Sequence, residues 1–180
     1  YDLIVIGGGS GGVRAARIAA LHGAKVALCE KDRMGGTCVI RGCIPKKLLF
    51  YSAQFKGLFD MASYYGWNVK KPKYNLLKMV QNKNKELVRL EGLYKKNAIK
   101  SGVDIFKGEA KLTSKNRVEI NNITLKSKNI IIAVGGEPIK LDVKGKEFAK
   151  DSDSIMQLKK LPKNLVIVGA GYIAIEFAFI

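Results

Sequence analysis

The stretch that most constrains the fold of this chain lies within its first 30 residues, where an apolar run, a glycine-rich turn and an alanine-rich segment follow one another. Residues 3–6 are continuously apolar, which is typical of a strand buried on both faces of a parallel sheet. Residues 7–12 read G-x-G-x-x-G, and residues 13–21 then show a helical apolar pattern. A second apolar run follows at residues 26–29. The order strand, turn, helix, strand predicts a βαβ unit and therefore an α/β fold.

The glycines of this turn have distinct physical roles in a nucleotide site. Gly7 permits the tight turn, Gly9 allows the backbone to approach a pyrophosphate, and Gly12 allows the helix to pack closely on the strand. Unpaired amides at the helix N-terminus would hold the phosphates. Glu30 follows the second apolar run, 18 residues after Gly12, where a carboxylate can accept hydrogen bonds from a ribose. The stretch therefore predicts a dinucleotide site.

Two of the three cysteines, Cys38 and Cys43, lie close together in residues 35–47. The pair could form a structural disulfide, bind a metal or act as a redox reagent. A ring so small would remove little entropy from the unfolded chain. A zinc site would need more ligands than the remaining cysteine and the single histidine. Pro45 predicts that a helix begins near Cys43, and a helix N-terminus favours the thiolate. We therefore favour the redox reagent and predict no metal.

A second glycine motif follows later in the chain. Residues 165–168 repeat the apolar character of residues 3–6, and residues 169–174 read G-x-G-x-x-A. This predicts a second strand, turn and helix, and hence a second dinucleotide. Two dinucleotides beside a reactive dithiol are typical of an electron relay that ends at a disulfide.

The segments between the two motifs predict helices and a set of short strands. Apolar spacing predicts helices at residues 48–62 and 74–100. A small antiparallel meander is expected from four alternating segments, at residues 103–106, 109–112, 117–120 and 123–125. Residues 129–134 are expected to form a further buried strand. The predicted fold is a Rossmann-like α/β domain with a β-meander over residues 1–137, followed by the start of a second Rossmann-like domain over residues 138–180.

The net charge of +17 raises the question of nucleic-acid binding. The lysines are scattered from Lys70 to Lys163 without a basic stripe interleaved with aromatic residues, so a nucleic-acid-binding module is the weaker alternative. No apolar run is long enough to cross a bilayer, and no leader pattern precedes residues 3–6. We therefore expect a cytoplasmic protein with no membrane and no nucleic-acid partner.

Residues 35–47 resemble the redox-disulfide signature of the flavin-dependent pyridine nucleotide-disulfide oxidoreductases. Together with residues 7–17 they look most like glutathione reductases, and the similarity runs over all 180 residues. The resemblance implies FAD and NADPH as cofactors, glutathione disulfide as substrate and a homodimer. It also implies a longer enzyme, of which this chain alone would be inactive. Lipoamide dehydrogenase, thioredoxin reductase and mercuric reductase of the same family remain alternatives, as does a flavin hydroxylase outside it.

The resemblance also implies roles for individual residues. Cys43 would face the flavin, and Cys38 would attack the substrate disulfide. Lys46 would lie near the flavin and pair with Glu176, so these four residues are the implied catalytic group. Motifs and resemblance together predict the cofactor-binding residues Gly7, Gly9, Ser10, Gly11, Gly12, Glu30, Thr37, Cys38, Lys46, Ala110, Gly135, Gly169, Gly171, Tyr172, Ile173 and Glu176. The implied substrate-binding residues are Ser10, Arg17 and Tyr94.

Overall fold

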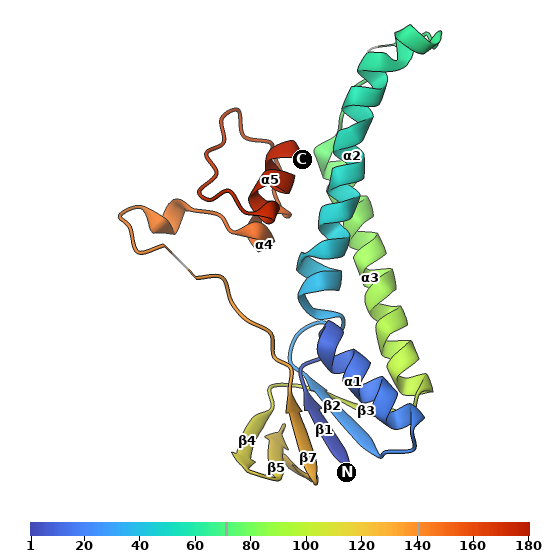
Figure 1. Ribbon diagram of the computed structural model, residues 1–180, viewed down its shortest axis with the longest axis vertical. Coiled ribbons are helices and arrows are strands. Elements are labelled where there is room, and N and C mark those ends of the chain that lie inside the picture. The colour runs from blue at the N-terminus through green and yellow to red at the C-terminus, as the bar shows by residue number, and fades with distance from the viewer. Residues whose placement is uncertain (71, 140) are drawn as a thin grey trace. The chain divides into compact units, whose positions relative to one another are not determined.

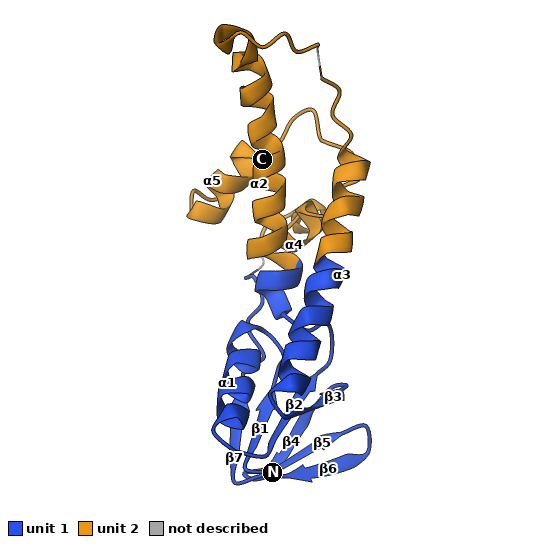
Figure 2. Cartoon of the chain, turned by 90° about the vertical axis from the view of Figure 1, so that its right-hand side faces the viewer, with its two compact units in different colours: residues 1–40, 87–141 blue, residues 41–86, 142–180 orange. Residues whose placement is uncertain are grey.

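The computed structural model describes residues 1–70, 72–139 and 141–180 (Figure 1). It has a mixed α/β fold with a parallel and an antiparallel sheet, which confirms the predicted fold class. The described residues form two compact units (Figure 2). Unit 1 comprises residues 1–40 and 87–141, and unit 2 comprises residues 41–86 and 142–180. The division into domains at residues 1–137 and 138–180 stays a prediction.

Unit 1 is built on the parallel sheet, whose strand order is β3-β2-β1-β7. β1 (Leu3–Ile6) and β2 (Val26–Glu30) are buried along their whole length, and α1 (Ser10–Leu21) connects them. β1 pairs in parallel with β2 on one side and with β7 (Asn129–Ile132) on the other. The βαβ unit predicted from the sequence is therefore confirmed.

The antiparallel sheet contains β4 (Lys111–Ser114), β5 (Arg117–Ile120) and β6 (Ile123–Lys126) in that order. The first segment predicted for this meander instead forms β3 (Val103–Lys107), which pairs in parallel with β2. β3 follows α3 (Leu76–Lys100), and a crossover helix lets the chain return for parallel pairing. The prediction that residues 103–106 belong to the meander is therefore wrong.

Different elements cover the two faces of the parallel sheet, because successive side chains of a strand point to opposite faces. Val5 lies in a buried cluster with Val13 of α1 and Ala98 of α3. Ile4 lies in a second cluster with Val118 of β5. The helices α1 and α3 thus cover one face, and the meander covers the other.

β7 differs from the buried strand predicted at residues 129–134. The strand ends at Ile132, and Ile131 and Ile132 are 39% and 63% exposed. β7 is the last strand of the sheet, so β1 is its only partner among the described strands. An edge strand is less covered than a central one, and apolar composition alone does not distinguish the two. The prediction of a buried strand is wrong in this respect.

Unit 2 consists of helices and connecting segments. α2 (Cys43–Met61) begins at the residue expected from Pro45 and continues as the 3-10 helix η2 (Ala62–Tyr65). The first part of α3 also lies in this unit. The later helices of the unit are η3 (Lys146–Phe148), α4 (Ser152–Ile155) and α5 (Tyr172–Phe179). The ring centroids of Phe50 and Phe179 lie 4.9 Å apart, so α2 and α5 pack together. No described helix is long and apolar enough to span a membrane.

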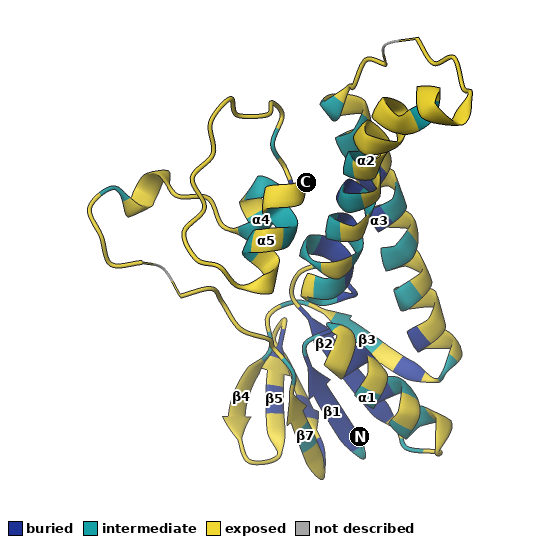
Figure 3. Ribbon diagram, turned by 45° about the horizontal axis from the view of Figure 1, so that its top comes forward, coloured by how far each residue is buried: buried dark blue, intermediate teal, exposed yellow. Residues whose placement is uncertain are grey.

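The strand expected at residues 165–168 is absent from the described part of the chain. The segment before α5 is exposed (Figure 3), with Val166 at 87% and Val168 at 73%. A strand needs neighbouring strands to pair its backbone groups, so an apolar run without such a neighbour does not form one. The predicted turn and helix are present, with Gly171 as the N-cap of α5.

Candidate nucleotide and redox site

The glycine-rich turn between β1 and α1 is packed so tightly that two of its residues must be glycine. Gly7 has a φ of 108°, a conformation that L side chains rarely adopt, and its amide donates to the carbonyl of Cys29 at 2.8 Å. A Cβ on Gly7 would lie 2.3 Å from the carbonyl oxygen of Ala133. A Cβ on Gly12 would lie 1.8 Å from the carbonyl oxygen of Gly7. The two glycines therefore let α1 start directly above the end of β1.

The start of α1 offers bare backbone to a ligand. Its N-cap is Gly9, which has no side chain that could bond to the amides of the first turn. A Cβ on Gly11 would meet no atom within 4 Å, and one on Gly9 would meet only the Cα of Gly36, at 3.8 Å. Amides at the N-terminus of a helix of this length bind phosphate groups well. Ser10 and Gly11 thus present open backbone at this helix start, and their binding of FAD stays a prediction.

Glu30 is held at the end of β2 by two backbone amides. Its Oε2 accepts a hydrogen bond from the amide of Gly8 at 2.5 Å, and its Oε1 accepts one from Asp32 at 2.6 Å. The residue is 9% exposed. The amide of Gly108 donates to the carbonyl of Glu30 at 2.9 Å, which brings the segment leading to Ala110 to the same end of the sheet. The structure therefore gathers the glycine turn, Glu30 and the approach to Ala110 at one place.

The segment before the cysteines packs directly on the glycine turn. Gly35 forms a parallel bridge with Gly9, and its amide donates to the carbonyl of Gly8 at 2.8 Å. Gly36 has a φ of 58°, and a Cβ there would lie 2.6 Å from the Cα of Gly9. The π-helix η1 (Thr37–Arg41) follows immediately. Thr37 and the half-buried Cys38 are therefore anchored beside the glycine turn.

Cys43, Lys46 and Glu176 lie in unit 2. Cys43 is the exposed first residue of α2, and the amide of Lys46 donates to the carbonyl of Gly42 at 2.9 Å. The Nζ of Lys46 lies 2.5 Å from Oε1 of Glu176 on α5. This ion pair is the pairing that the family resemblance implies. The Cys38–Cys43 bond, and the roles of Lys46 and Glu176 toward a flavin, stay predictions.

The three predicted substrate-binding residues line one cavity in unit 1. Ser10 and Arg17 of α1 and Tyr94 of α3 surround a volume of about 300 Å³. Arg14 and Asn97 line it as well, and the sequence did not predict either as a site residue. Both could have been found from helix geometry, because each lies three residues from a predicted site residue on the same helix. The Nε of Arg17 donates to Oγ of Ser101 at 3.2 Å, which orients the guanidinium.

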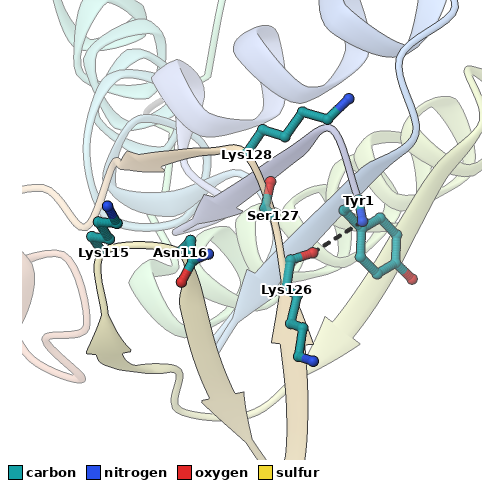
Figure 4. Close-up of a pocket in the computed structure, with 6 residues that line it drawn as sticks. All are labelled: Tyr1, Lys115, Asn116, Lys126, Ser127 and Lys128. Carbon is teal, nitrogen blue, oxygen red and sulfur yellow. Dashed lines mark hydrogen bonds between the residues drawn. The ribbon is translucent and has the colours of Figure 1, made fainter.

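A second, more open hollow lies beside the first residue of the chain (Figure 4). Its lining includes Lys115, Lys126 and Lys128. Figure 4 shows the side chains of Lys126 and Lys128 pointing in opposite directions, so their charges do not converge on one ligand. The dashed line in that view is the hydrogen bond from the amino group of Tyr1 to the carbonyl of Lys126, at 3.0 Å.

The second glycine motif lies in unit 2, at the start of α5. Gly169 has a φ of 108°, and Gly171 caps the helix without a side-chain hydrogen bond in the described structure. Tyr172 and Ile173 are 77% and 45% exposed. Their part in a second nucleotide site, like that of Gly135 in the first, stays a prediction. Among the described residues, no three of His, Cys, Asp or Glu are grouped to hold a metal ion.

The family model described as pyridine nucleotide-disulphide oxidoreductase matches residues 1–180. The chain belongs to this family. Among curated relatives, the glutathione reductase of Burkholderia cepacia is 46% identical over 178 residues, which are 99% of this chain and 40% of that protein. The glutathione reductase of Nostoc sp. is also 46% identical over 178 residues, 99% of this chain and 39% of that protein. The chloroplastic/mitochondrial enzyme of Pisum sativum is 42% identical over 189 residues, 99% of this chain and 34% of that protein.

Among solved structures, the chain is similar to the HOCl-induced flavoprotein disulfide reductase RclA from Escherichia coli. It superposes with a TM-score of 0.83 and 28% identity, over 99% of this chain and 39% of that one. The family member described here thus spans about two fifths of the length of the first two curated relatives and of RclA.

Proposed function

We propose that the protein is a flavin-dependent disulfide reductase that passes electrons from NADPH through FAD to the Cys38–Cys43 pair and on to glutathione disulfide. The observation that carries this proposal is the packing of the cysteine segment on the glycine turn, through Gly35 and Gly9. This contact keeps a cysteine within a few residues of the place where a dinucleotide would bind. A structural disulfide would need no such neighbour.

FAD, when bound, supplies two-electron chemistry between a nicotinamide and a dithiol. The chain would hold it through the open amides of Ser10 and Gly11 and through the carboxylate of Glu30. Lys46 and Glu176 would form a charged pair near the isoalloxazine. These assignments rest on the geometry of the glycine turn and on the family resemblance.

Two cysteines of the chain would carry out the reduction of the substrate disulfide. The Cys38 thiolate would attack one sulfur of glutathione disulfide, forming a mixed disulfide while the first glutathione leaves as its thiolate. The Cys43 thiolate would then attack the Cys38 sulfur, releasing the second glutathione and closing the Cys38–Cys43 bond. Each cycle oxidises the dithiol to the disulfide, which supplies the two electrons, and the two released glutathione thiolates take up protons.

Glutathione disulfide is favoured over other disulfides by the cavity between α1 and α3. Glutathione disulfide carries several carboxylates, and the cavity presents the guanidinium groups of Arg14 and Arg17 beside the hydroxyls of Ser10 and Tyr94. The glutathione reductases among the relatives support the same choice. NADPH as donor, a homodimer and a cytoplasmic location belong to the same proposal.

Replacing Cys38 by serine tests this function in the full-length, FAD-loaded enzyme. Cys38→Ser should abolish glutathione reduction while NADPH oxidation by an artificial acceptor continues. Cys29→Ala is the matched control, because Cys29 is buried and burial raises the pKa of its thiol to about 11. The control should keep full activity. Glutathione turnover that survives Cys38→Ser would disprove the role of Cys38, and a strong preference of the wild type for lipoamide or thioredoxin would overturn the substrate.

A further inference from the structure

An ion pair links the cysteine segment to a helix that no motif includes. The Nε of Arg41 lies 3.4 Å from Oδ2 of Asp153 on α4. The two side chains are 39% and 40% exposed, so the pair is partly shielded from solvent. Arg41 lies between Cys38 and Cys43 in the sequence. Asp153 therefore binds the peptide that the proposed disulfide would close into a ring.

Asp153 is presented by an anchored helix. The Oδ1 of Asp151 caps α4 by accepting hydrogen bonds from the amide of Ser154 at 2.9 Å and from its hydroxyl at 2.5 Å. Met156, at the end of α4, is 3% exposed. Its carbonyl accepts a hydrogen bond from Nζ of Lys83 on α3, at 2.6 Å. The carboxylate of Asp153 is therefore held at a fixed place within unit 2.

Chain connectivity keeps the backbone of Arg41 close to that of both cysteines. Arg41 is two residues from Cys43 and three from Cys38. Extended backbone covers about 3.5 Å per residue, so its Cα lies at most about 7 Å and about 11 Å from the two cysteine Cα atoms. These limits are close to the screening length of about 8 Å at physiological salt. A positive charge at this range stabilises a thiolate, and Asp153 partly neutralises it.

We propose that Asp153 is a positioning residue that sets the redox equilibrium of the Cys38–Cys43 pair through its ion pair with Arg41. The inference rests on the proposed function only in that these cysteines form the redox pair. Reduction breaks the S–S bond, places two electrons on the sulfurs and leaves one thiolate beside a thiol at neutral pH. Arg41 favours this reduced state, and Asp153 offsets that effect and favours the disulfide.

The test compares two substitutions in the FAD-loaded protein, equilibrated with mixtures of reduced and oxidised dithiothreitol. Dithiothreitol gives two electrons and one proton to the disulfide, releases its second proton to the solvent and closes its own ring. Asp153→Asn should shift the equilibrium toward the dithiol, and Arg41→Gln should shift it toward the disulfide. Each shift should be about twofold to fivefold, as expected for a unit charge at this separation in a partly solvated site. This shift equals a change of about 9 to 20 mV in the reduction potential of the cysteine pair, at about 30 mV per tenfold change in the equilibrium constant.

Two controls accompany these variants. Arg41→Lys keeps the positive charge and should therefore shift the equilibrium by less than Arg41→Gln does. Asp142→Asn removes the exposed ion pair with Lys146 in the same unit and should shift nothing. The readout is mass spectrometry of alkylated Cys38 and Cys43, which counts the reduced pair directly.

The proposal depends on the two substitutions shifting the dithiol–disulfide equilibrium in opposite directions. Shifts in the same direction for Asp153→Asn and Arg41→Gln would show that the pair only tethers the loop, and this would overturn the proposal. An unchanged equilibrium in both variants would overturn it too. A wild-type pair that never forms a reversible disulfide would refute the proposed function, and the inference with it, so the two failures are distinguishable.

Discussion

Replacing Gly12 by alanine tests whether the start of α1 is packed as tightly on β1 as the structure indicates. The added Cβ would lie 1.8 Å from the carbonyl oxygen of Gly7 and 3.2 Å from Cγ1 of Val5. Ordinary contact between a carbon and a carbonyl oxygen is about 3.3 Å, so α1 would have to move by about 1.5 Å. Overpacking typically costs about 1–3 kcal/mol. We expect the upper end of this range, because the closest partner is backbone and cannot rotate away.

Gly11→Ala is the matched control, one residue earlier on the same helix. A Cβ at this position would meet no atom within 4 Å. Alanine is favoured over glycine in a helix by about 0.5–1 kcal/mol, so this variant should be as stable as the wild type or slightly more stable.

Urea unfolding followed by circular dichroism, without added FAD, measures both variants. The free energies of unfolding should differ by about 3 kcal/mol, which is the overpacking cost alone, because the helix preference of alanine over glycine applies to both variants. The slope of the free energy against urea should be the same in both variants, since the surface exposed on unfolding is unchanged. If the two variants unfolded at the same urea concentration, the packing argument would be refuted.

Two further predictions concern the substrate cavity and a buried lysine. In the full-length enzyme, Arg17→Ala should raise the KM for glutathione disulfide at least about tenfold with little change in kcat, because a charge-assisted hydrogen bond is worth about 1.5–3 kcal/mol. Arg117→Ala, which lies outside the cavity, is the control, and an unchanged KM in Arg17→Ala would contradict the substrate assignment. Lys83 is 1% exposed, and burial lowers the pKa of its ammonium below the usual 10.5. At pH values between the lowered pKa and 10.5, Lys83 is neutral in the folded protein and protonated in the unfolded one, so unfolding takes up a proton. The free energy of unfolding of the wild type should therefore rise with pH across that window, relative to that of Lys83→Met. Urea unfolding at several alkaline pH values measures this difference, and parallel curves for the two proteins would contradict it.

The sequence predicted local structure well where the pattern and its partner are close in the chain. The glycine turn, α1 and the two central strands lie within one continuous stretch, and the structure has them as expected. α2 begins at Cys43 because Pro45 suits the first turn of a helix. These features depend on residues that are neighbours in sequence.

Features that depend on distant partners were predicted less well. The alternation of residues 103–106 indicates a strand but not its neighbour, and the neighbour is β2 rather than the meander. Residues 165–168 have the composition of β1 but pair with no described strand. The contact of Gly35 with Gly9 and the ion pair of Arg41 with Asp153 join residues that share no motif. Sequence spacing carries no information about such pairs.

The fixed carboxylate of Glu30 has a consequence for which nucleotides the first turn can accept. Both of its oxygens are already bound to backbone amides, those of Gly8 and Asp32, so the charge cannot turn aside when a ligand arrives. A ribose with free hydroxyls can donate to this carboxylate, whereas a 2′-phosphate would bring negative charge against it. We therefore expect the turn to discriminate against phosphorylated adenosine. NADPH would then be excluded from the place proposed for the flavin, even where it is the more abundant nucleotide.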